Sequence, residues 1–347
     1  MAATVCFLLV TLSSQVQVLG KCPVDSVSKI LAGNFVSPDD KQFLVVEEIG
    51  DIVCQNAVTL AKVQVYRLVL LHKTDRGYQR RWQSELFLGR DAVNVSLLPD
   101  IWASGDVDGD SLLEIVTIKG DSGTVLNLGP DSLFIKTFSI ADGVVIDALC
   151  ADMELDGFME LVTLEQIADS TNRKEVIRVW QIIDTELRQR GKAIELPDWE
   201  QGMKFSFLGS ARLEDYPGAP VLVLGEYPSL RPSRYYALYP ARSDSFVLTG
   251  TPFPYQEWFS KEEVLAAGRL QLFNVGDTLV AYGYFVPGTG GGSGQSFAAL
   301  QDGEWRVLRL KEGAKKIVGP ICQFGSGFLE LRNRQFYLFT EEPFYWR

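Results

Sequence analysis

Short apolar runs that alternate with polar residues recur along the chain and predict β-strands. The runs are rich in Val, Ile, Phe and Tyr, and Gly, Pro, Asp, Ser or Asn bounds each of them, as is typical of strands that end in turns. Clear examples are KQFLVVEE from Lys41, LEIVTI from Leu113, EVIRVWQII from Glu175 and PVLVLGE from Pro220. The pattern therefore predicts an all-β fold of antiparallel sheets.

Helical periodicity is scarce, and one short segment, SKEEVLAAG at residues 260–268, carries it. Ser260 can cap a helix, Glu263 completes a capping box three residues later, and Gly268 can end the helix. We therefore expect a single short helix in an otherwise β-rich chain.

A small residue, a polar turn and a strand recur together as a repeating unit. The interval between most copies is roughly 45 to 60 residues, which is room for about four strands and is the size of a propeller blade. Each blade exposes apolar faces that only its neighbours can bury, so the ring must close. The sequence predicts a single β-propeller of six four-stranded blades, and the longer first interval leaves room for a seventh. The six copies begin at Gly33, Gly105, Ala151, Gly209, Gly268 and Cys322.

The first twenty residues admit two interpretations. They contain no acidic or basic side chain, and an apolar stretch from Val5 to Leu12 precedes polar residues and the small residue Gly20, as in a secretory signal. The same residues can instead form a strand that closes the ring. We therefore assign 1–20 to a signal peptide or a ring-closing strand, and 21–347 to the propeller. No later segment has the roughly 20 apolar residues of a transmembrane helix.

Composition and charge exclude several classes of function. Hydrophobic residues make up 46% of the chain and charged residues 22%, which is the balance of a folded protein with a core. The net charge of -11 argues against a nucleic-acid partner, because phosphate backbones are bound through clusters of Lys and Arg. The single histidine, His72, makes histidine-dependent triads and histidine-rich zinc sites unexpected.

The five cysteines are widely spaced and form no CxxC motif, which argues against a zinc site. If Cys6 is removed with a signal peptide, Cys22, Cys54, Cys150 and Cys322 remain and allow three pairings. A short loop makes Cys22 with Cys54 the favoured disulfide. Buried free thiols are the alternative, because cysteine packs well as a small apolar residue.

The stretch GDVDGDSLLEIV, residues 105–116, indicates a cation site. The stretch offers only oxygen atoms as ligands, and its four carboxylates carry four formal negative charges. Such a ligand set suits Ca²⁺ rather than Zn²⁺ or copper. Gly109 lies where a sharp turn needs a residue without a side chain. The alternative is a solvated acidic turn, in which the four carboxylates would repel one another. The expected ligands are the carboxylates at loop positions 1, 3, 5 and 9 and the carbonyl oxygen at position 7: Asp106, Asp108, Asp110, Glu114 and Leu112.

The copy at residues 151–162 repeats the acidic spacing and predicts a second, weaker calcium site. Leu155 replaces the turn glycine and disfavours a left-handed conformation, and Gly157 comes two residues later. The copies from Gly33, Gly209 and Gly268 lack the carboxylate spacing, so we interpret them as structural turns. The expected ligands of the second site are Asp152, Glu154, Asp156 and Glu160.

The run GDVDGDSLLEIV resembles the FG-GAP or VCBS repeat of integrin α-subunit propellers and of many bacterial extracellular proteins. Both acidic loops are similar to that family's D-x-[DN]-x-D calcium pattern, most specifically over residues 101–118 and less so over 147–164. The resemblance implies a β-propeller, loop-bound Ca²⁺ and a role in extracellular interaction or adhesion. Most copies in this chain are degenerate, which reduces the expected calcium sites to one or two.

These features predict a calcium-stabilised, secreted or extracytoplasmic propeller that binds a protein or carbohydrate partner without catalysis. The alternative is a propeller hydrolase or lyase acting on glycans, with catalytic carboxylates at the central channel. No motif nominates such a pair. An unexplained group of perturbed carboxylates at the channel would favour the enzyme. Four tryptophans near predicted loops or chain ends can serve as contact residues or fill gaps between blades: Trp102, Trp199, Trp258 and Trp346.

Overall fold

Every regular element that the structure describes is a strand, which confirms the prediction of an all-β fold. The helix expected at 260–268 lies outside the described residues, as do Cys6, Trp199 and Trp258. The described part of the chain contains no helix that could span a membrane. The computed structural model describes residues 16–55, 60–84, 87–88, 101–119, 121–128, 134–139, 143–168, 173–183, 186–197, 203–213, 216–226, 234–242, 245–251, 271–275, 278–285, 294–301, 304–310, 321–324, 327–339 and 344–346.

The described strands form six antiparallel sheets, four of four strands and two of five. In the first three sheets, neighbouring strands follow one another in chain order, apart from the short β6, which pairs with β4. These sheets consist of β2 (Val27–Gly33), β3 (Gln42–Gln55), β4 (Leu60–Thr74), β5 (Gly77–Gln83) and β6 (Phe87–Leu88); of β7 (Ile101–Gly105), β8 (Glu114–Lys119), β9 (Ser122–Asn127) and β10 (Phe134–Ser139); and of β11 (Val144–Ala151), β12 (Glu160–Ala168), β13 (Arg173–Ile183) and β14 (Glu186–Glu195).

The other three sheets follow the same order, and two of them gain a strand from a chain end. The short β26 pairs with β22, and β1 pairs with β25. These sheets consist of β15 (Lys204–Ser210), β16 (Val221–Glu226), β17 (Arg234–Arg242) and β18 (Ser245–Thr251); of β19 (Gln271–Val275), β20 (Thr278–Phe285), β21 (Gly294–Gln301), β22 (Glu304–Leu310) and β26 (Phe344–Trp346); and of β23 (Ile321–Phe324), β24 (Gly327–Arg332), β25 (Gln335–Phe339) and β1 (Val16–Lys21).

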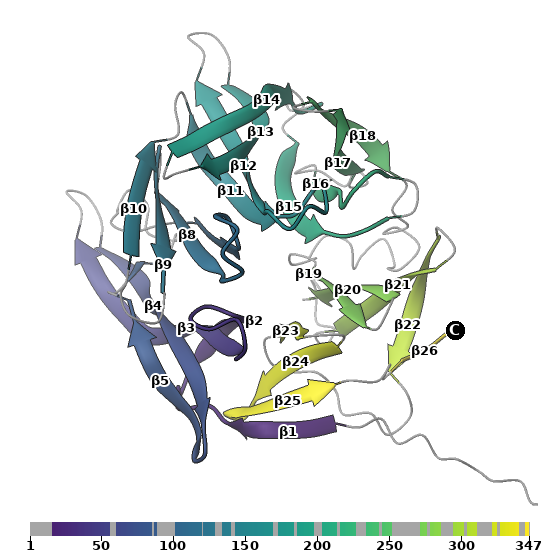
Figure 1. Cartoon of the computed structure of the whole chain (residues 1–347). Helices are drawn as coiled ribbons and strands as arrows, with labels where there is room; N and C mark the ends of the chain where they lie inside the picture. Colours follow the sequence, from purple (N-terminus) through teal and green to yellow (C-terminus); the bar gives the residue numbers. More distant parts are fainter. Residues whose placement is uncertain are drawn as a thin grey trace, which may run out of the picture.

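The sixth sheet combines the first described strand with three strands from the last part of the chain. β1 runs antiparallel to β25, with Val16 opposite Phe339 and Lys21 opposite Gln335. Residues 16–20, which belong to the segment assigned to a signal peptide or a ring-closing strand, therefore lie in a paired strand. Figure 1 shows β1 along the outer side of this sheet, beside the strands from the opposite end of the chain.

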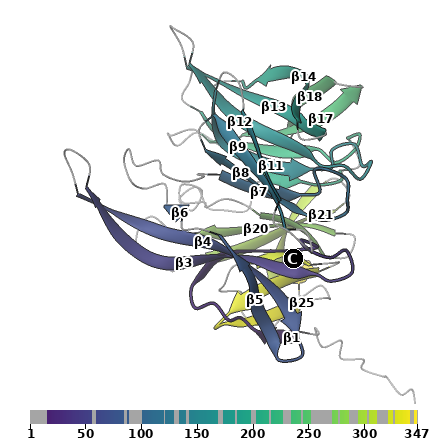
Figure 2. The same cartoon turned by 60° about the vertical axis from the view of Figure 1, so that its left-hand side comes forward.

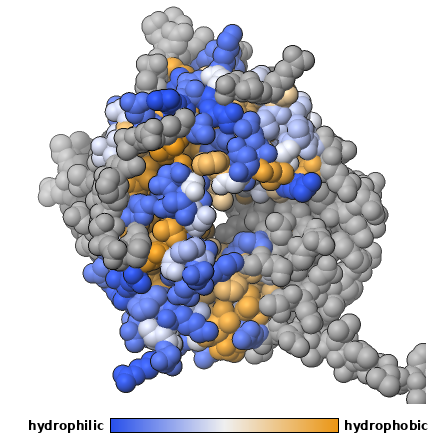
Figure 3. All heavy atoms as spheres, viewed as in Figure 1, coloured by the Kyte–Doolittle hydropathy of each residue, from blue (hydrophilic) through white to orange (hydrophobic). Residues whose placement is uncertain are grey.

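The six sheets are arranged around a common centre (Figure 1). Most of their first strands lie side by side near that centre: β2 contacts β23, β7 contacts β11, β11 contacts β15, β15 contacts β19, and β19 contacts β23. The space-filling view from the same side shows an opening near the middle of this face (Figure 3). The acidic loops after β7 and β11 therefore begin at strands on the inner side of their sheets.

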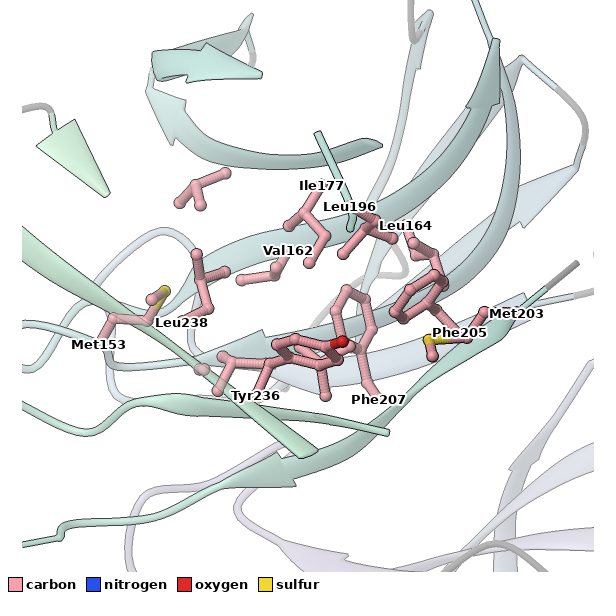
Figure 4. Packing of buried hydrophobic residues seen from close by; sticks show 14 residues of the cluster. Met153, Val162, Leu164, Ile177, Leu196, Met203, Phe205, Phe207, Tyr236 and Leu238 are labelled. Atoms are coloured by element: carbon pink, nitrogen blue, oxygen red, sulfur yellow. The ribbon is translucent and has the colours of Figure 1, made fainter. Parts of the chain in front are cut away.

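The hydrophobic core consists of clusters between successive sheets. In β12, Leu161 packs in a cluster with residues of the second sheet, whereas Val162 packs in a cluster with residues of the fourth. Figure 4 shows the second of these clusters, in which Val162 and Ile177 of the third sheet meet Phe207 of the fourth. Successive strand residues point to opposite faces of a sheet. Both faces are buried here, which explains why these strands are continuous apolar runs.

The long first repeat interval is taken up by an extended hairpin among the described residues. β3 and β4 have 14 and 15 residues, and Figure 2 shows this hairpin projecting from the rest of the molecule. β5 and β6 belong to the same sheet. The described residues between Gly33 and Gly105 thus contribute to one sheet before β7 begins the next.

The cysteines that the structure describes in full are free thiols. Cys22, Cys150 and Cys322 have no disulfide partner, so the pairing of Cys22 with Cys54 favoured from the sequence is wrong. Cys22 is buried in an apolar cluster with Val24 and Phe43. The alternative interpretation from the sequence, a buried free thiol that packs as an apolar residue, describes Cys22.

Candidate metal centre

The acidic residues of the β7–β8 loop fold the loop through hydrogen bonds to its own backbone. The carboxylate of Asp106 accepts hydrogen bonds from the N–H groups of Gly109 at 2.7 Å and Ser111 at 2.9 Å. Asp108 accepts one from the N–H of Asp110 at 3.3 Å, and Asp110 accepts one from the N–H of Leu112 at 2.8 Å. Short acidic side chains favour such local turns. The loop shape thus follows from the spacing of its aspartates.

Two loop residues have left-handed backbone conformations. Gly109 has a φ of 82°, as predicted for the glycine of a sharp turn, and Ser111 has a φ of 69°. A Cβ atom on Gly109 would also lie 2.2 Å from Cε1 of Phe158 in the next loop. Gly109 is therefore needed both for its φ angle and for the close approach of Phe158.

Glu114 is the buried carboxylate of this loop. Its side chain is 1% exposed. One oxygen accepts a hydrogen bond from the N–H of Val107 at 3.0 Å and the other from the amide of Asn127 at 3.1 Å. Burial raises the pKa of Glu114 to about 8; the hydrogen bond from Val107 acts against this shift, and the three aspartates of the loop add to it. The hydrogen bonds thus compensate only in part for the burial of the ionised form of Glu114.

Three of the predicted ligands converge. Carboxylate oxygens of Asp106, Asp108 and Glu114 lie within 4.8 Å of one another. Asp110 does not belong to this group, and its side chain instead accepts the hydrogen bond from the N–H of Leu112. A set of three carboxylates fits a hard cation such as Ca²⁺, which takes oxygen ligands.

The second acidic loop, between β11 and β12, folds in the same way. The carboxylate of Asp152 accepts hydrogen bonds from the N–H groups of Asp156 and Gly157, both at 3.0 Å. Leu155 has φ of 60°, although a leucine disfavours this conformation. The two bonds to Asp152 fix the turn around Leu155 and offset the penalty of about 1–2 kcal/mol for a left-handed residue.

A side chain from the outermost strand brings a positive charge to the second loop. Arg190 of β14 lies 2.9 Å from Glu160 and 3.0 and 3.1 Å from the two oxygens of Glu154. Glu160 also accepts a hydrogen bond from the N–H of Met153 at 3.1 Å, as Glu114 does from Val107. Burial raises the pKa of Glu160, and Arg190 acts in the opposite direction. Two of the four predicted ligands are therefore bound to an arginine.

Glu114 differs from the other buried glutamates of the described chain. Five glutamates are buried. Four of them lie in ion pairs with arginine, whereas Glu114 has no ion pair among the described residues and is surrounded by three aspartates. The four pairs are Glu47 with Arg67 and Arg80, Glu160 with Arg190, Glu165 with Arg178, and Glu330 with Arg332.

The first repeat contains a similar loop, in which a neutral glutamine takes the place of the buried glutamate. Gln42, 2% exposed, begins β3 as Glu114 begins β8 and Glu160 begins β12. Its side-chain oxygen accepts hydrogen bonds from the N–H groups of Phe35 at 2.7 Å and Val36 at 3.1 Å. The sequence interpretation treated this copy as a structural turn. The missed signal is a glutamine seven residues after Phe35, the same separation as between Val107 and Glu114.

Backbone hydrogen bonds link these loops from one sheet to the next. Leu113 N–H donates to Asn34 at 2.7 Å, Met159 N–H to Asp106 at 3.0 Å, and Ala219 N–H to Met153 at 2.9 Å. A Cβ atom on Gly105 would lie 2.5 Å from that of Cys150. The small residue that begins this repeat thus allows two neighbouring sheets to approach.

The remaining residues singled out from the sequence lie apart from this loop or are described only in part. Trp102 is in β7 and Trp346 is in β26, and their side chains are not among those described. Cys150 lies next to the loop, and burial raises the pKa of its thiol to about 12, with a further contribution from Glu114. A neutral thiol at this position packs as an apolar group.

Comparisons with known proteins give no family assignment. No protein-family model matches the chain, and no curated protein matches it. Among solved structures, it is similar to the β-propeller domain of Nup133 from Vanderwaltozyma polyspora, with 10% sequence identity, a TM-score of 0.39, and coverage of 77% of this chain and 78% of that chain. Conclusions about the fold and the site of this chain therefore rest on its own strand pairings and contacts.

Proposed function

We propose that this chain is a single six-bladed β-propeller that serves as a non-catalytic interaction module and holds Ca²⁺ in the β7–β8 loop. The six sheets have the strand order of propeller blades, and each follows the next around a common centre. The pairing of β1 with β25 supports ring closure, because the first described strand completes a blade formed by the last part of the chain. The proposal retains the FG-GAP or VCBS resemblance of the acidic loops.

The observation that carries the calcium proposal is the environment of Glu114. This carboxylate is buried, has no ion pair among the described residues, and converges with Asp106 and Asp108. Asp106, Asp108 and Glu114 would hold the ion, and a bound Ca²⁺ would supply the positive charge that arginines supply to the other buried glutamates.

The role of the ion in this proposal is structural. The loop that would hold it contacts both neighbouring loops, because Leu113 donates to Asn34 and Asp106 accepts from Met159. Neutralising the loop therefore stabilises the contact between three successive blades. A secreted or extracytoplasmic location agrees with this role, since weak calcium sites are filled where calcium is abundant.

The ion pairs of the buried glutamates favour binding over catalysis. A glycan-cleaving enzyme needs a pair of carboxylates with perturbed pKa values that can reach substrate. Four of the five buried glutamates that the structure describes, Glu47, Glu160, Glu165 and Glu330, are instead held by arginines. The fifth, Glu114, belongs to the proposed calcium site. We therefore propose that the protein binds a protein or carbohydrate partner and does not transform it. Hydrolysis or elimination of a polysaccharide by the purified protein would contradict this part of the proposal.

Thermal unfolding in EDTA and in millimolar Ca²⁺ tests the metal site. A ligand that binds only the native state raises the unfolding midpoint by mass action. We expect Ca²⁺ to raise the midpoint of the wild type and to have no effect on Asp108→Ala. Asp121→Ala is the matched control, because Asp121 is an exposed aspartate outside the loop. A wild-type midpoint that is equal in EDTA and Ca²⁺ would contradict the calcium proposal.

A further inference from the structure

The two acidic loops have the same fold but obtain their positive charge differently. We propose that Arg190 is the built-in cation of the β11–β12 loop, so that this loop binds no metal and the chain takes a single Ca²⁺ at the β7–β8 loop. The part concerning Ca²⁺ rests on the proposed function, whereas the role of Arg190 stands on its own contacts. The inference replaces the second calcium site expected from the sequence.

The contacts of Arg190 engage the two longest carboxylates of the loop. One terminal nitrogen lies 3.0 Å from Glu154 and 2.9 Å from Glu160, and the other lies 3.1 Å from the second oxygen of Glu154. The arginine side chain is 12% exposed. A guanidinium that contacts both oxygens of one carboxylate and bridges to a second is a strong, directional partner.

The position of Arg190 in the blade explains how it reaches the loop. Arg190 lies opposite Val179 in the pairing of β14 with β13, where the register of the two strands shifts. Such irregularities redirect side chains at the ends of sheets. The guanidinium carbon also lies 5.7 Å from the centre of the Phe246 ring of the neighbouring sheet. The side chain is thus placed by its strand and by an aromatic contact, independently of any metal.

Arg190 occupies the groups that a metal would need. Glu154 and Glu160 stand at loop positions 3 and 9, where the first loop has Asp108 and Glu114. With both side chains bound to a guanidinium, an incoming cation would have to displace Arg190 and leave it partly buried without its partners, which is unfavourable. The longer side chain of Glu154, compared with that of Asp108, extends toward the arginine.

Calcium should then stabilise only some of the backbone contacts between neighbouring loops. The contacts of the β7–β8 loop with Asn34 and Met159 would respond to the ion. The contact between Met153 and Ala219, made by the second loop, would be held in place without it. We therefore expect two contacts between blades that depend on calcium and one that does not.

A double-mutant cycle in EDTA tests the role of Arg190 without any metal. Arg190→Met leaves Glu160 buried without its partner, and we expect it to lower the unfolding midpoint by about 5 °C or more. Glu160→Gln combined with Arg190→Met should recover part of this loss. Arg188→Met on the same strand is the control, because Arg188 and Glu186 form an exposed ion pair, and its effect should be small. Equal effects of the two arginine substitutions, or no coupling between Arg190 and Glu160, would overturn the proposal.

A second set of variants tests whether the loop binds metal. Glu114→Gln disables the first loop, so Ca²⁺ should no longer raise the unfolding midpoint of this variant. If Ca²⁺ still raises it, and the additional change Glu154→Gln removes that effect, the second loop binds metal and the inference is wrong. If the wild type shows no response to Ca²⁺, the proposed function fails, and the role of Arg190 is decided by the double-mutant cycle.

Discussion

The backbone N–H of Met159 donates a hydrogen bond of 3.0 Å to the carbonyl oxygen of Asp106. This bond joins the loops of two neighbouring sheets, and it ends at the first acidic residue of the candidate metal centre. Because the side chain of Asp106 converges with Asp108 and Glu114, the conformation of the acidic loop and the contact between the sheets depend on each other.

The contact between Gly109 and Phe158 predicts unequal effects of two glycine substitutions. Gly157→Ala, at φ of 91° with open space around it, should lower the free energy of unfolding by about 1 kcal/mol through backbone strain. Gly109→Ala, at φ of 82°, adds a collision with the Phe158 ring and should lower it by about 2–3 kcal/mol. Denaturant unfolding in EDTA measures both.

Phe158→Ala provides the control for this comparison. In the Phe158→Ala protein, Gly109→Ala should lower the free energy of unfolding no more than Gly157→Ala does, because the ring that collides with the new methyl group is gone. Equal effects of the two glycine substitutions in the wild type would show that Phe158 does not pack on Gly109 in solution.

Glu114 predicts a pH dependence of stability in the absence of metal. Its pKa of about 8 in the folded protein lies above the ordinary value of 4.5. Between these two pH values, the folded state therefore holds a proton that the unfolded state has lost. Stability should therefore fall as the pH rises from about 4.5 to about 8. We expect a thermal unfolding series in EDTA to show a smaller fall for Glu114→Gln than for the wild type.

Added Ca²⁺ should oppose this fall, because the ion favours the ionised carboxylate. Burial also raises the pKa values of Glu160 and Glu165, so the difference between the wild type and Glu114→Gln is the informative quantity. Identical pH profiles for the two proteins would contradict the environment assigned to Glu114.

Gln42 predicts a large effect of a neutral side chain in a loop that lacks the carboxylate spacing of the other two. Gln42→Met keeps the length of the side chain but removes the oxygen that accepts hydrogen bonds from Phe35 and Val36. Two buried N–H groups would lose their partner, so the free energy of unfolding should fall by about 2–4 kcal/mol. The exposed residue Gln79 supplies the control, since Gln79→Met should change stability by less than about 0.5 kcal/mol. A similar small change at both positions would refute the role of Gln42.

The β1–β25 pairing predicts that the first residues contribute to stability. A chain that begins at Lys21 lacks nearly all of β1 and leaves β25 without its outer partner. Its unfolding midpoint should be lower by about 5 °C or more than that of a chain that begins at Val16, and it should aggregate more readily through the open edge.

The same comparison bears on signal-peptide cleavage. Cleavage after Gly20 would remove the residues of β1 that pair with β25 from Phe336 to Phe339. Equal midpoints of the two chains would mean that β1 is dispensable for the fold, and cleavage at that position would then be compatible with the rest of the structure.

The all-β class and the shape of the first acidic loop could be predicted from the sequence because both depend on local patterns. Alternating apolar residues and turn residues determine the strands, and the aspartates of the 105–116 segment are close enough in sequence to form their hydrogen bonds within the loop. Glu114 could be predicted as one of the converging carboxylates from its place at position 9 of the loop.

The pairing of the second loop with Arg190 could not be predicted in the same way. Arg190 lies 30 residues after Glu160, and its approach depends on the register shift between β13 and β14. The left-handed Leu155 was likewise unexpected, because an intrinsic preference was overridden by the hydrogen bonds of Asp152. Both features depend on tertiary contacts that the spacing of acidic residues does not reveal.

The most direct test of the account is the number of Ca²⁺ ions bound by the metal-free protein, measured by isothermal titration calorimetry. We predict one ion per chain for the wild type and none for Asp108→Ala. A wild-type chain that binds no Ca²⁺, or an Asp108→Ala chain that still binds one, would contradict the assignment of the β7–β8 loop as a metal centre.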